Sequence, residues 1–363
     1  MPTVNERLAD AEVSHAISLQ GYSNGVVRRM ISLLNKADEE LSAKLMAAVE
    51  SMPPGSFTVQ RLDQLMLSVQ AVNAQAYAAL RRDLEAELLA YADYESGFQY
   101  SVMTSAVPQS VQAVVAVNAI SADMVYAAAM ARPFQGKLLS ELTRNIEAAR
   151  MTRIRDAVRM GFIEGETVSQ IVRRIRGTKS AGYADGLLEI DRRGAEAIVR
   201  TAISHMSNVA RQSFYDANGD LVEEWQFVAV LDGRTTITCA SLSGKTFPKG
   251  AGPQPPRHIN CRSQSVPVVT SIWRALGLSE DEIEPGEQAS MDGQVAADLN
   301  YSEWLRGKSA AFQDSVLGPT RGKLFRDGKV SVDKFTNNKG VVYTLEELRR
   351  RDRELFERAG VEA

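Results

Sequence analysis

The sequence predicts a mainly α-helical α+β protein with a small antiparallel β-sheet and a Pro/Gly-rich loop. Three observations support this fold class. Aromatic residues make up only 7% of the chain while alanine is abundant, a composition that favours helices over β-sandwiches. Apolar residues recur with helical spacing through the first two-thirds of the chain. Residues 224–231 instead alternate with the period of a β-strand.

Length, charge and composition indicate a folded protein of several structural units with no overall affinity for nucleic acid or membranes. The chain has 363 residues, enough for two or three structural units of about 150 residues each. Its 42 Lys and Arg residues are balanced by 45 Asp and Glu, so there is no overall attraction to nucleic acid or anionic membranes. The contents of 44% apolar and 24% charged residues are those of a folded protein.

No signal peptide and no stable membrane insertion are expected. The N-terminus lacks a basic region followed by an apolar stretch. The most apolar long segment, residues 113–131, is interrupted by Asn118, Ser121 and Asp123. A charge near the centre of a membrane span is costly, so this segment is expected to be a buried or partner-facing helix.

Helices are predicted along most of the first 220 residues. The longest cover residues 24–50, 57–92 and 137–160. Gly161 is expected to stop the third of these, and a short helix follows with Thr167 as its N-cap and Gly177 at its end. Asp191 is expected to cap one more helix, which ends at Asn218-Gly219.

A small sheet is predicted in the middle of the chain. Its strands are expected at residues 224–231, 245–247 and 264–269, and residues 248–257 form the Pro/Gly-rich loop, which is unsuited to a helix or a central strand. Helices return after residue 271, with one predicted over residues 290–315. Another begins at Leu345, where Thr344 and Glu347 form a capping box.

The richest chemistry surrounds the only two cysteines, Cys239 and Cys261, together with His258. These three residues could bind zinc, with Asp232 or a water molecule as fourth ligand. They could instead be reduced thiols and an ordinary histidine that hold the loop by packing. A disulfide is the third alternative.

The same stretch resembles the phage head morphogenesis family, the Mu F-like minor head proteins. The family pattern runs Asp-x-Arg-Thr-x-x-x-Cys, then a Gly-Lys turn, then Pro-Pro-x-His-x-x-Cys-Arg. The matching residues are Asp232, Arg234, Thr235, Cys239, Gly244, Lys245, Pro255, Pro256, His258, Cys261 and Arg262. Many relatives carry further cysteines where this chain has Thr236 and Ser263, and this departure weakens the metal interpretation.

The resemblance extends over about residues 131–350 and implies a division of the chain. Residues 1–130 are predicted to be an N-terminal helical, partner-binding region. Residues 131–270 are predicted to form the Mu F-like core, and residues 271–363 a helical extension of the same domain. Asp232, Arg234, Thr235, Gly244, Pro256 and Arg262 are expected to be structural, with no cofactor required.

The function implied by the resemblance is that of a minor head protein of a tailed bacteriophage. Such a protein lies inside the head near the portal and assists head assembly and DNA packaging or delivery. The implied partners are the portal protein, capsid or scaffold proteins and, more weakly, packaged double-stranded DNA. No enzymatic activity is expected. Two alternatives stay open, namely an ejected internal DNA-binding protein and an enzyme that uses the Cys/His cluster.

A local basic stripe offers a contact for DNA or an acidic partner. Arg144, Arg155 and Arg159 fall on one face of the predicted helix over residues 137–160, opposite its apolar face. A solvated surface is the simpler interpretation of these residues. His15 and His205 are not expected to take part in a site.

Overall fold

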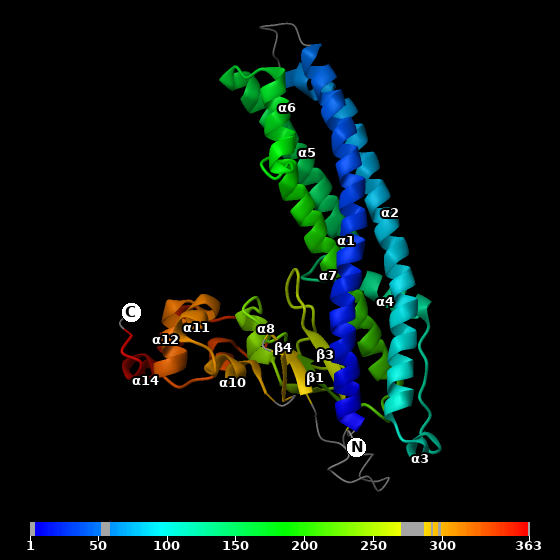
Figure 1. Cartoon of the computed structure of the whole chain (residues 1–363), viewed down its shortest axis with the longest axis vertical. Helices are drawn as coiled ribbons and strands as arrows, with labels where there is room; N and C mark the ends of the chain where they lie inside the picture. Colours follow the sequence, from blue (N-terminus) through cyan, green and yellow to red (C-terminus); the bar gives the residue numbers. More distant parts are fainter. Residues whose placement is uncertain (1–3, 52–58, 270–286, 292, 297–298, 362–363) are drawn as a thin grey trace. The chain divides into compact units, whose positions relative to one another are not determined.

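The computed structural model describes residues 4–51, 59–269, 287–291, 293–296 and 299–361. It confirms a mainly helical α+β fold with a small antiparallel sheet. The chain forms two compact units (Figure 1). We call them the sheet unit, which comprises the described parts of residues 1–19, 92–125 and 204–363, and the helical unit, which comprises residues 20–91 and 126–203.

Three long helices contribute residues to both units. They are α1 (Val4–Glu50), α2 (Val59–Ala106) and α7 (Leu188–Ala217). The two units are defined by how compactly their residues pack, and this definition does not test the predicted functional division at residue 130. The predicted assignment of partner binding to residues 1–130 concerns function and stays a prediction.

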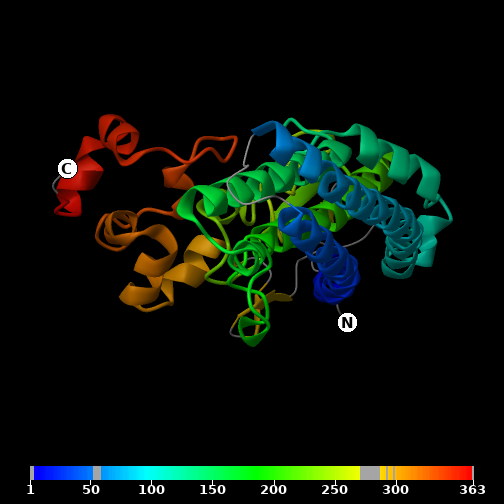
Figure 2. The same ribbon diagram turned by 90° about the horizontal axis from the view of Figure 1, so that it is seen from above.

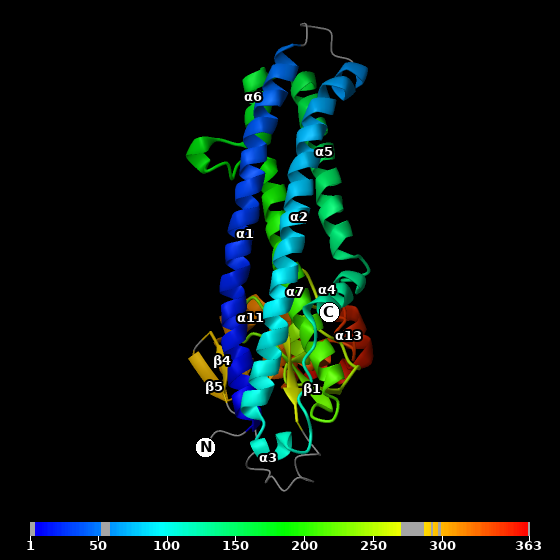
Figure 3. The ribbon, with the colours of Figure 1, turned by 90° about the vertical axis from the view of Figure 1, so that its right-hand side faces the viewer.

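The helical unit is built from α1, α2, α5 (Leu139–Glu164) and α7, which run along a common direction (Figures 1 and 3). The helix α6 (Val168–Arg176) and the part of α4 (Ala122–Ala131) from Tyr126 onward complete it. Apolar side chains at helical spacing fill its core, among them Leu41, Val69, Ile154, Ile171 and Leu188. Removing these side chains from water is the main stabilising contribution to this unit.

The α5 helix runs past its predicted end. Gly161 lies inside the helix, where a Cβ atom would come within 2.4 Å of the Ile171 side chain. The helix ends instead at Gly165, which has a φ of 71° and caps it in the left-handed conformation. Gly161 therefore serves the close packing of α6 on α5. The predicted Thr167 cap and Gly177 stop of α6 are confirmed.

Ion pairs with buried carboxylates neutralise several arginines of the helical unit. Arg150 is fully buried and pairs with Asp38, whose other oxygen lies 2.8 Å from Arg192 Nη1. Asp191 was expected to cap α7, but that helix begins at Leu188. Asp191 lies in its first turn and pairs with Arg153, because a buried carboxylate requires a cationic partner.

The sheet unit contains the predicted three-stranded antiparallel sheet, in the order β2-β1-β3. The strands are β2 (Thr246–Pro248), β1 (Glu224–Val228) and β3 (Gln264–Val268). Trp225 lies opposite Phe247 on one side and Pro267 on the other. Trp225 and Phe227 are fully buried and belong to the same apolar core as Phe214 and Tyr215 of α7.

The C-terminal part differs from its prediction. Residues 287–290 and 293–296 form a β-hairpin, β4 and β5, instead of the start of a helix over residues 290–315. Two short helices follow, α10 (Tyr301–Arg306), which is capped by Asn300, and α11 (Ala310–Leu317), which is capped by Ser309. Each cap satisfies backbone N–H groups and so starts a new helix.

The remaining helices close this region. They are α12 (Pro319–Asp327), α13 (Leu345–Arg351) and α14 (Arg353–Arg358). Figure 2 shows α10 to α14, in orange to red, gathered in one group, around a core that includes Trp304, Leu324 and Phe335. The predicted capping box of Thr344 and Glu347 starts α13. The segment over residues 113–131 is helical only from Ala122 onward.

Candidate functional site

The Cys/His cluster is assembled by a short helix and the Pro/Gly-rich loop. Thr236 caps α8 (Ile237–Leu242), and its hydroxyl accepts a hydrogen bond from the backbone N–H of Cys239. The loop then returns the chain to β3 and brings His258 and Cys261 against this helix. Both cysteines are buried free thiols, and His258 is half-buried.

The three side chains meet at one point. Cys239 Sγ lies 3.7 Å from Cys261 Sγ and 3.3 Å from His258 Nε2. The other ring nitrogen of His258, Nδ1, lies 2.8 Å from the carbonyl oxygen of Ile259. An N–H at Nδ1 therefore donates to this carbonyl, which leaves Nε2 facing the two sulfur atoms.

Proximity shifts the pKa values of the three groups. The hydrogen bond with Cys261, together with burial, raises the pKa of the Cys239 thiol. The same hydrogen bond holds the pKa of Cys261 well below its usual value in spite of burial, and His258 acts in the same direction. The hydrogen bond with Cys261 raises the pKa of His258, against the effect of burial. Cys261 is thus the residue that most readily carries a negative charge.

Two kinds of chemistry are available to this arrangement. A thiolate beside a histidine can act as a nucleophile if a substrate reaches the sulfur, but the side chain of Cys261 is only 3% exposed. Two sulfurs and an imidazole nitrogen can also ligate a borderline-soft metal ion. Among the described residues, these three form a group whose ligand atoms all lie within 4.8 Å of one another.

Asp232, which follows β1 in the chain, holds the motif together. Its carboxylate accepts two hydrogen bonds from Arg262, at 2.6 and 2.8 Å, and one from the backbone N–H of Arg234 at 3.0 Å. Burial disfavours the charged form, but Arg262 and then Arg234 outweigh this effect and lower the pKa of Asp232. Asp232 is thus paired with Arg262. The group of possible metal ligands described above does not include Asp232.

The other predicted motif residues have separate structural roles. The Thr235 hydroxyl donates to the Val230 carbonyl at 2.5 Å. Gly244 has a φ of 79°, and its N–H donates to the Phe227 carbonyl, which makes the turn into β2. Pro256 is buried in the loop, whereas the side chain of Arg234 is 81% exposed.

The predicted basic stripe lies on α5 in the helical unit. Arg144, Arg155 and Arg159 are all exposed. Arg155 Nη1 lies 3.7 Å from Asp63 Oδ1, a weak exposed ion pair. This surface is therefore open to an acidic partner or phosphate, and a role in binding either stays a prediction.

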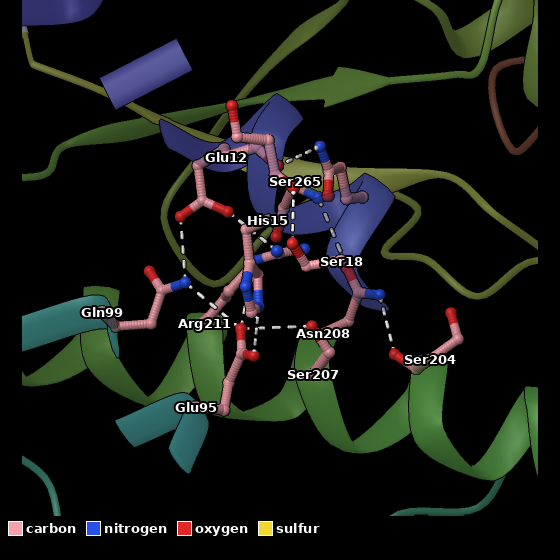
Figure 4. Close-up of polar contacts among 12 residues, drawn as sticks. Glu12, His15, Ser18, Glu95, Gln99, Ser204, Ser207, Asn208, Arg211 and Ser265 are labelled. Carbon is pink, nitrogen blue, oxygen red and sulfur yellow. Dashed lines mark hydrogen bonds and ion pairs between the residues drawn. The ribbon is translucent and has the colours of Figure 1, made fainter. Parts of the chain in front are cut away.

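A buried charge network in the sheet unit was not predicted from the sequence. It joins Glu12 and His15 of α1, Glu95 and Gln99 of α2, and Arg211 of α7 (Figure 4). Arg211 Nη2 lies 2.7 Å from Glu12 Oε2, and His15 Nε2 lies 2.6 Å from Glu95 Oε2. The Gln99 amide donates to Glu12 at 2.9 Å.

The network also reaches the sheet. The Gln264 amide of β3 donates to the Glu12 carbonyl at 3.3 Å, and the Ser265 N–H donates to Asn208 of α7 at 3.3 Å. His15, from which the sequence predicted no role in a site, is buried in this network, and its ring stacks on Phe98 with the ring centres 3.9 Å apart. A sequence signal did exist, since Glu12 and His15 occupy the helical face of Leu8 and Leu19.

The fold and the cluster define a mainly helical protein in which a small sheet carries a Cys/His loop. Residues 152–266 match the family described as Phage Mu protein F like protein, which confirms the resemblance seen in the motif. This match supports a Mu F-like head morphogenesis family for that part of the chain. Comparisons with curated proteins and with solved structures find no match.

In the described part of the chain, no helix combines the length and the apolar character needed to cross a bilayer.

The Asp232–Arg262 pair predicts a specific dependence of stability on pH. Because its pKa is lowered in the folded state, ionised Asp232 adds stability above its unfolded pKa of about 4. That contribution is lost as the pH falls through the folded pKa. Urea unfolding of Asp232→Asn should show a loss of about 1–3 kcal/mol at pH 7 and a smaller one near pH 3. An equal loss at both values would contradict this role.

Arg211 should be among the most sensitive positions of the sheet unit. Arg211→Met leaves Glu12 and Glu95 buried without their cation and should cost about 3–5 kcal/mol of unfolding free energy. Burial already raises the pKa of Glu12. The variant should therefore regain stability on acidification, because both carboxyl groups can then bind protons.

Chemical denaturation at pH 5 and pH 8 measures this effect. The matched control is Arg29→Met, which removes the partner of Glu87 in an exposed pair and should cost no more than about 1 kcal/mol. A loss for Arg211→Met that equals the control, or that does not change with pH, would contradict the interpretation.

Proposed function

We propose that this protein is a minor head protein of a tailed bacteriophage that binds near the portal inside the capsid. It assists head assembly and DNA packaging or delivery. The observation that carries the proposal is the match of residues 152–266 to the Mu F-like family, together with the Asp232 to Arg262 motif. On this proposal, the motif is a structural element and the chain acts by binding other head proteins.

Exposed apolar side chains support a partner-binding role for residues 1–130. In the sheet unit, Ile17 of α1 is 64% exposed and Met124 of α4 is 68% exposed. In the helical unit, Leu67 and Leu89 of α2 are also exposed. Single exposed apolar residues are common, but long helices that carry several of them suit packing against other subunits. The partners proposed are the portal protein first, and then capsid or scaffold proteins.

The partner surface can be tested by placing a charge at the exposed apolar positions. Ile17→Glu and Met124→Glu should change the unfolding free energy by no more than about 0.5 kcal/mol, since both side chains are exposed. Each should weaken binding to the purified portal ring by about tenfold or more if it lies in the interface. Native mass spectrometry and sedimentation measure the binding.

The matched control is Val341→Glu, which alters an apolar side chain that is 59% exposed and lies outside residues 1–130. It should bind the portal ring as the unaltered protein does. Failure of the unaltered protein to bind portal, capsid or scaffold proteins would overturn the proposed function. Equal effects of all three substitutions would overturn only the assignment to residues 1–130.

A second candidate function, binding of packaged DNA, is favoured by a basic pocket in the sheet unit. This pocket has a volume of about 720 Å³ and is lined by four cationic side chains, Arg306, Lys308, Arg326 and Lys329. Arg326 also pairs with Asp314 at 2.7 Å, so the lining keeps a surplus of positive charge. Phosphate groups are the anions that such a surface would attract from DNA.

Duplex DNA binding at several salt concentrations tests this candidate. Arg306→Glu and Lys329→Glu should lower the affinity and reduce the slope of its salt dependence by about one unit for each phosphate that is no longer neutralised. Charge reversals at Arg144, Arg155 and Arg159 test the α5 stripe in the same way. The control is Arg353→Glu, at an exposed residue that pairs with Glu357. Weak binding that none of these reversals changes would exclude both surfaces.

A further inference from the structure

We propose that Cys239, His258 and Cys261 bind one zinc ion, with a water molecule as the fourth ligand. The ion fastens the Pro/Gly-rich loop to α8. This inference stands apart from the proposed function, because it concerns the chain alone and needs no partner.

The spacing of the ligand atoms fits a tetrahedral ion. Zinc lies about 2.3 Å from a cysteine sulfur and about 2.0–2.1 Å from a histidine nitrogen. In a regular tetrahedron these bond lengths place two sulfurs about 3.8 Å apart and a sulfur and a nitrogen about 3.6 Å apart. The distances here are 3.7 Å between the sulfurs and 3.3 Å from Cys239 Sγ to His258 Nε2. The ion can therefore enter with small movements of the ligands.

The histidine is already oriented as a ligand. Its Nδ1 donates to the Ile259 carbonyl at 2.8 Å, so the lone pair of Nε2 is directed at the sulfurs. Histidines that bind metals almost always donate their second ring N–H to a carbonyl, carboxylate or water. This outer hydrogen bond fixes both the tautomer and the orientation of the ring.

Charge balance suits a buried ion. Two thiolates and a neutral imidazole carry a charge of −2, which one zinc ion neutralises, so the occupied site has no net charge to desolvate. The hydroxyl of Thr236 accepts a hydrogen bond from the backbone N–H of Cys239, one of the three ligands. Such contacts from an outer layer of ligands position the inner ones.

The fourth ligand is assigned to solvent. The cysteines are 1% and 3% exposed, whereas His258 is half-buried and is followed by the exposed residues Ile259 and Asn260. Water can thus reach the ion from the side of the histidine. In the part of the chain that is described, no carboxylate lies with the three ligands, and Asp232 is held by Arg262. The ion therefore lacks a neighbouring general base, and its role is to crosslink the loop.

Metal content and cobalt substitution test the proposal. The full chain is purified under reducing conditions without chelator, and its zinc content is measured by elemental analysis. One zinc per chain is expected. After removal of zinc, added cobalt should give the charge-transfer absorption of two thiolate ligands and the visible bands of a tetrahedral ion. Returning zinc to the metal-free protein should raise its melting temperature by on the order of 5 °C.

Substitutions identify the ligands. Cys261→Ser and His258→Gln should each lower the zinc content well below one per chain and change the cobalt spectrum. Arg234→Gln is the matched control, because it alters the same motif at an exposed side chain and should keep one zinc. If the ligand variants fail to fold, as judged by circular dichroism, the cobalt spectrum of the unaltered chain still reports the number of thiolate ligands.

Several results would overturn the proposal. One is a chain that contains no stoichiometric zinc and shows neither a thiolate–cobalt absorption nor a shift in melting temperature. Another is a disulfide between Cys239 and Cys261 in protein purified under reducing conditions. A third is unchanged zinc content in both ligand variants. Portal binding is not part of these measurements, so their failure is distinguishable from failure of the proposed function.

Discussion

The ion pair between Arg211 and Glu12 is the contact on which the sheet unit depends. Arg211 is fully buried on α7, and its charge is matched by Glu12 of α1 and Glu95 of α2. Burying a guanidinium without carboxylates would cost several kcal/mol. The three helices must therefore meet at this point, and α7 leads directly to β1. A hydrogen bond from Gln264 of β3 to the Glu12 carbonyl adds the sheet to the constraint.

Local signals predicted most of the fold and of the candidate site. Capping residues and glycines act within a few residues of the backbone they control, so the Thr167 cap, the Thr344–Glu347 box and the alternation around Trp225 were all identified. The cysteines and His258 lie within 23 residues of one another. A turn of the loop is enough to bring them together.

Partners far apart in the sequence could not be predicted in the same way. Glu12 and Arg211 are brought together only by tertiary packing of their helices. A polar residue on the apolar face of a helix does not indicate which distant residue it will contact. Asp191 illustrates the same difficulty, because an acidic residue near a helix start can either cap that helix or pair with a cation on another helix. The incorrect prediction of one helix over residues 290–315 has a different cause. Asn300 and Ser309 each cap a separate short helix within this stretch.

The match to the Mu F-like family covers residues 152–266, yet these residues do not complete a core by themselves. Val4 and Leu8 of α1 and Met103 of α2 share an apolar cluster with Trp225, Phe227 and both cysteines. The first 130 residues thus supply part of the interior against which the Cys/His loop packs. Since α1 also presents Ile17 to solvent, one helix both completes the core and offers a surface. A partner that binds this helix would therefore act on a segment already fixed by the buried network.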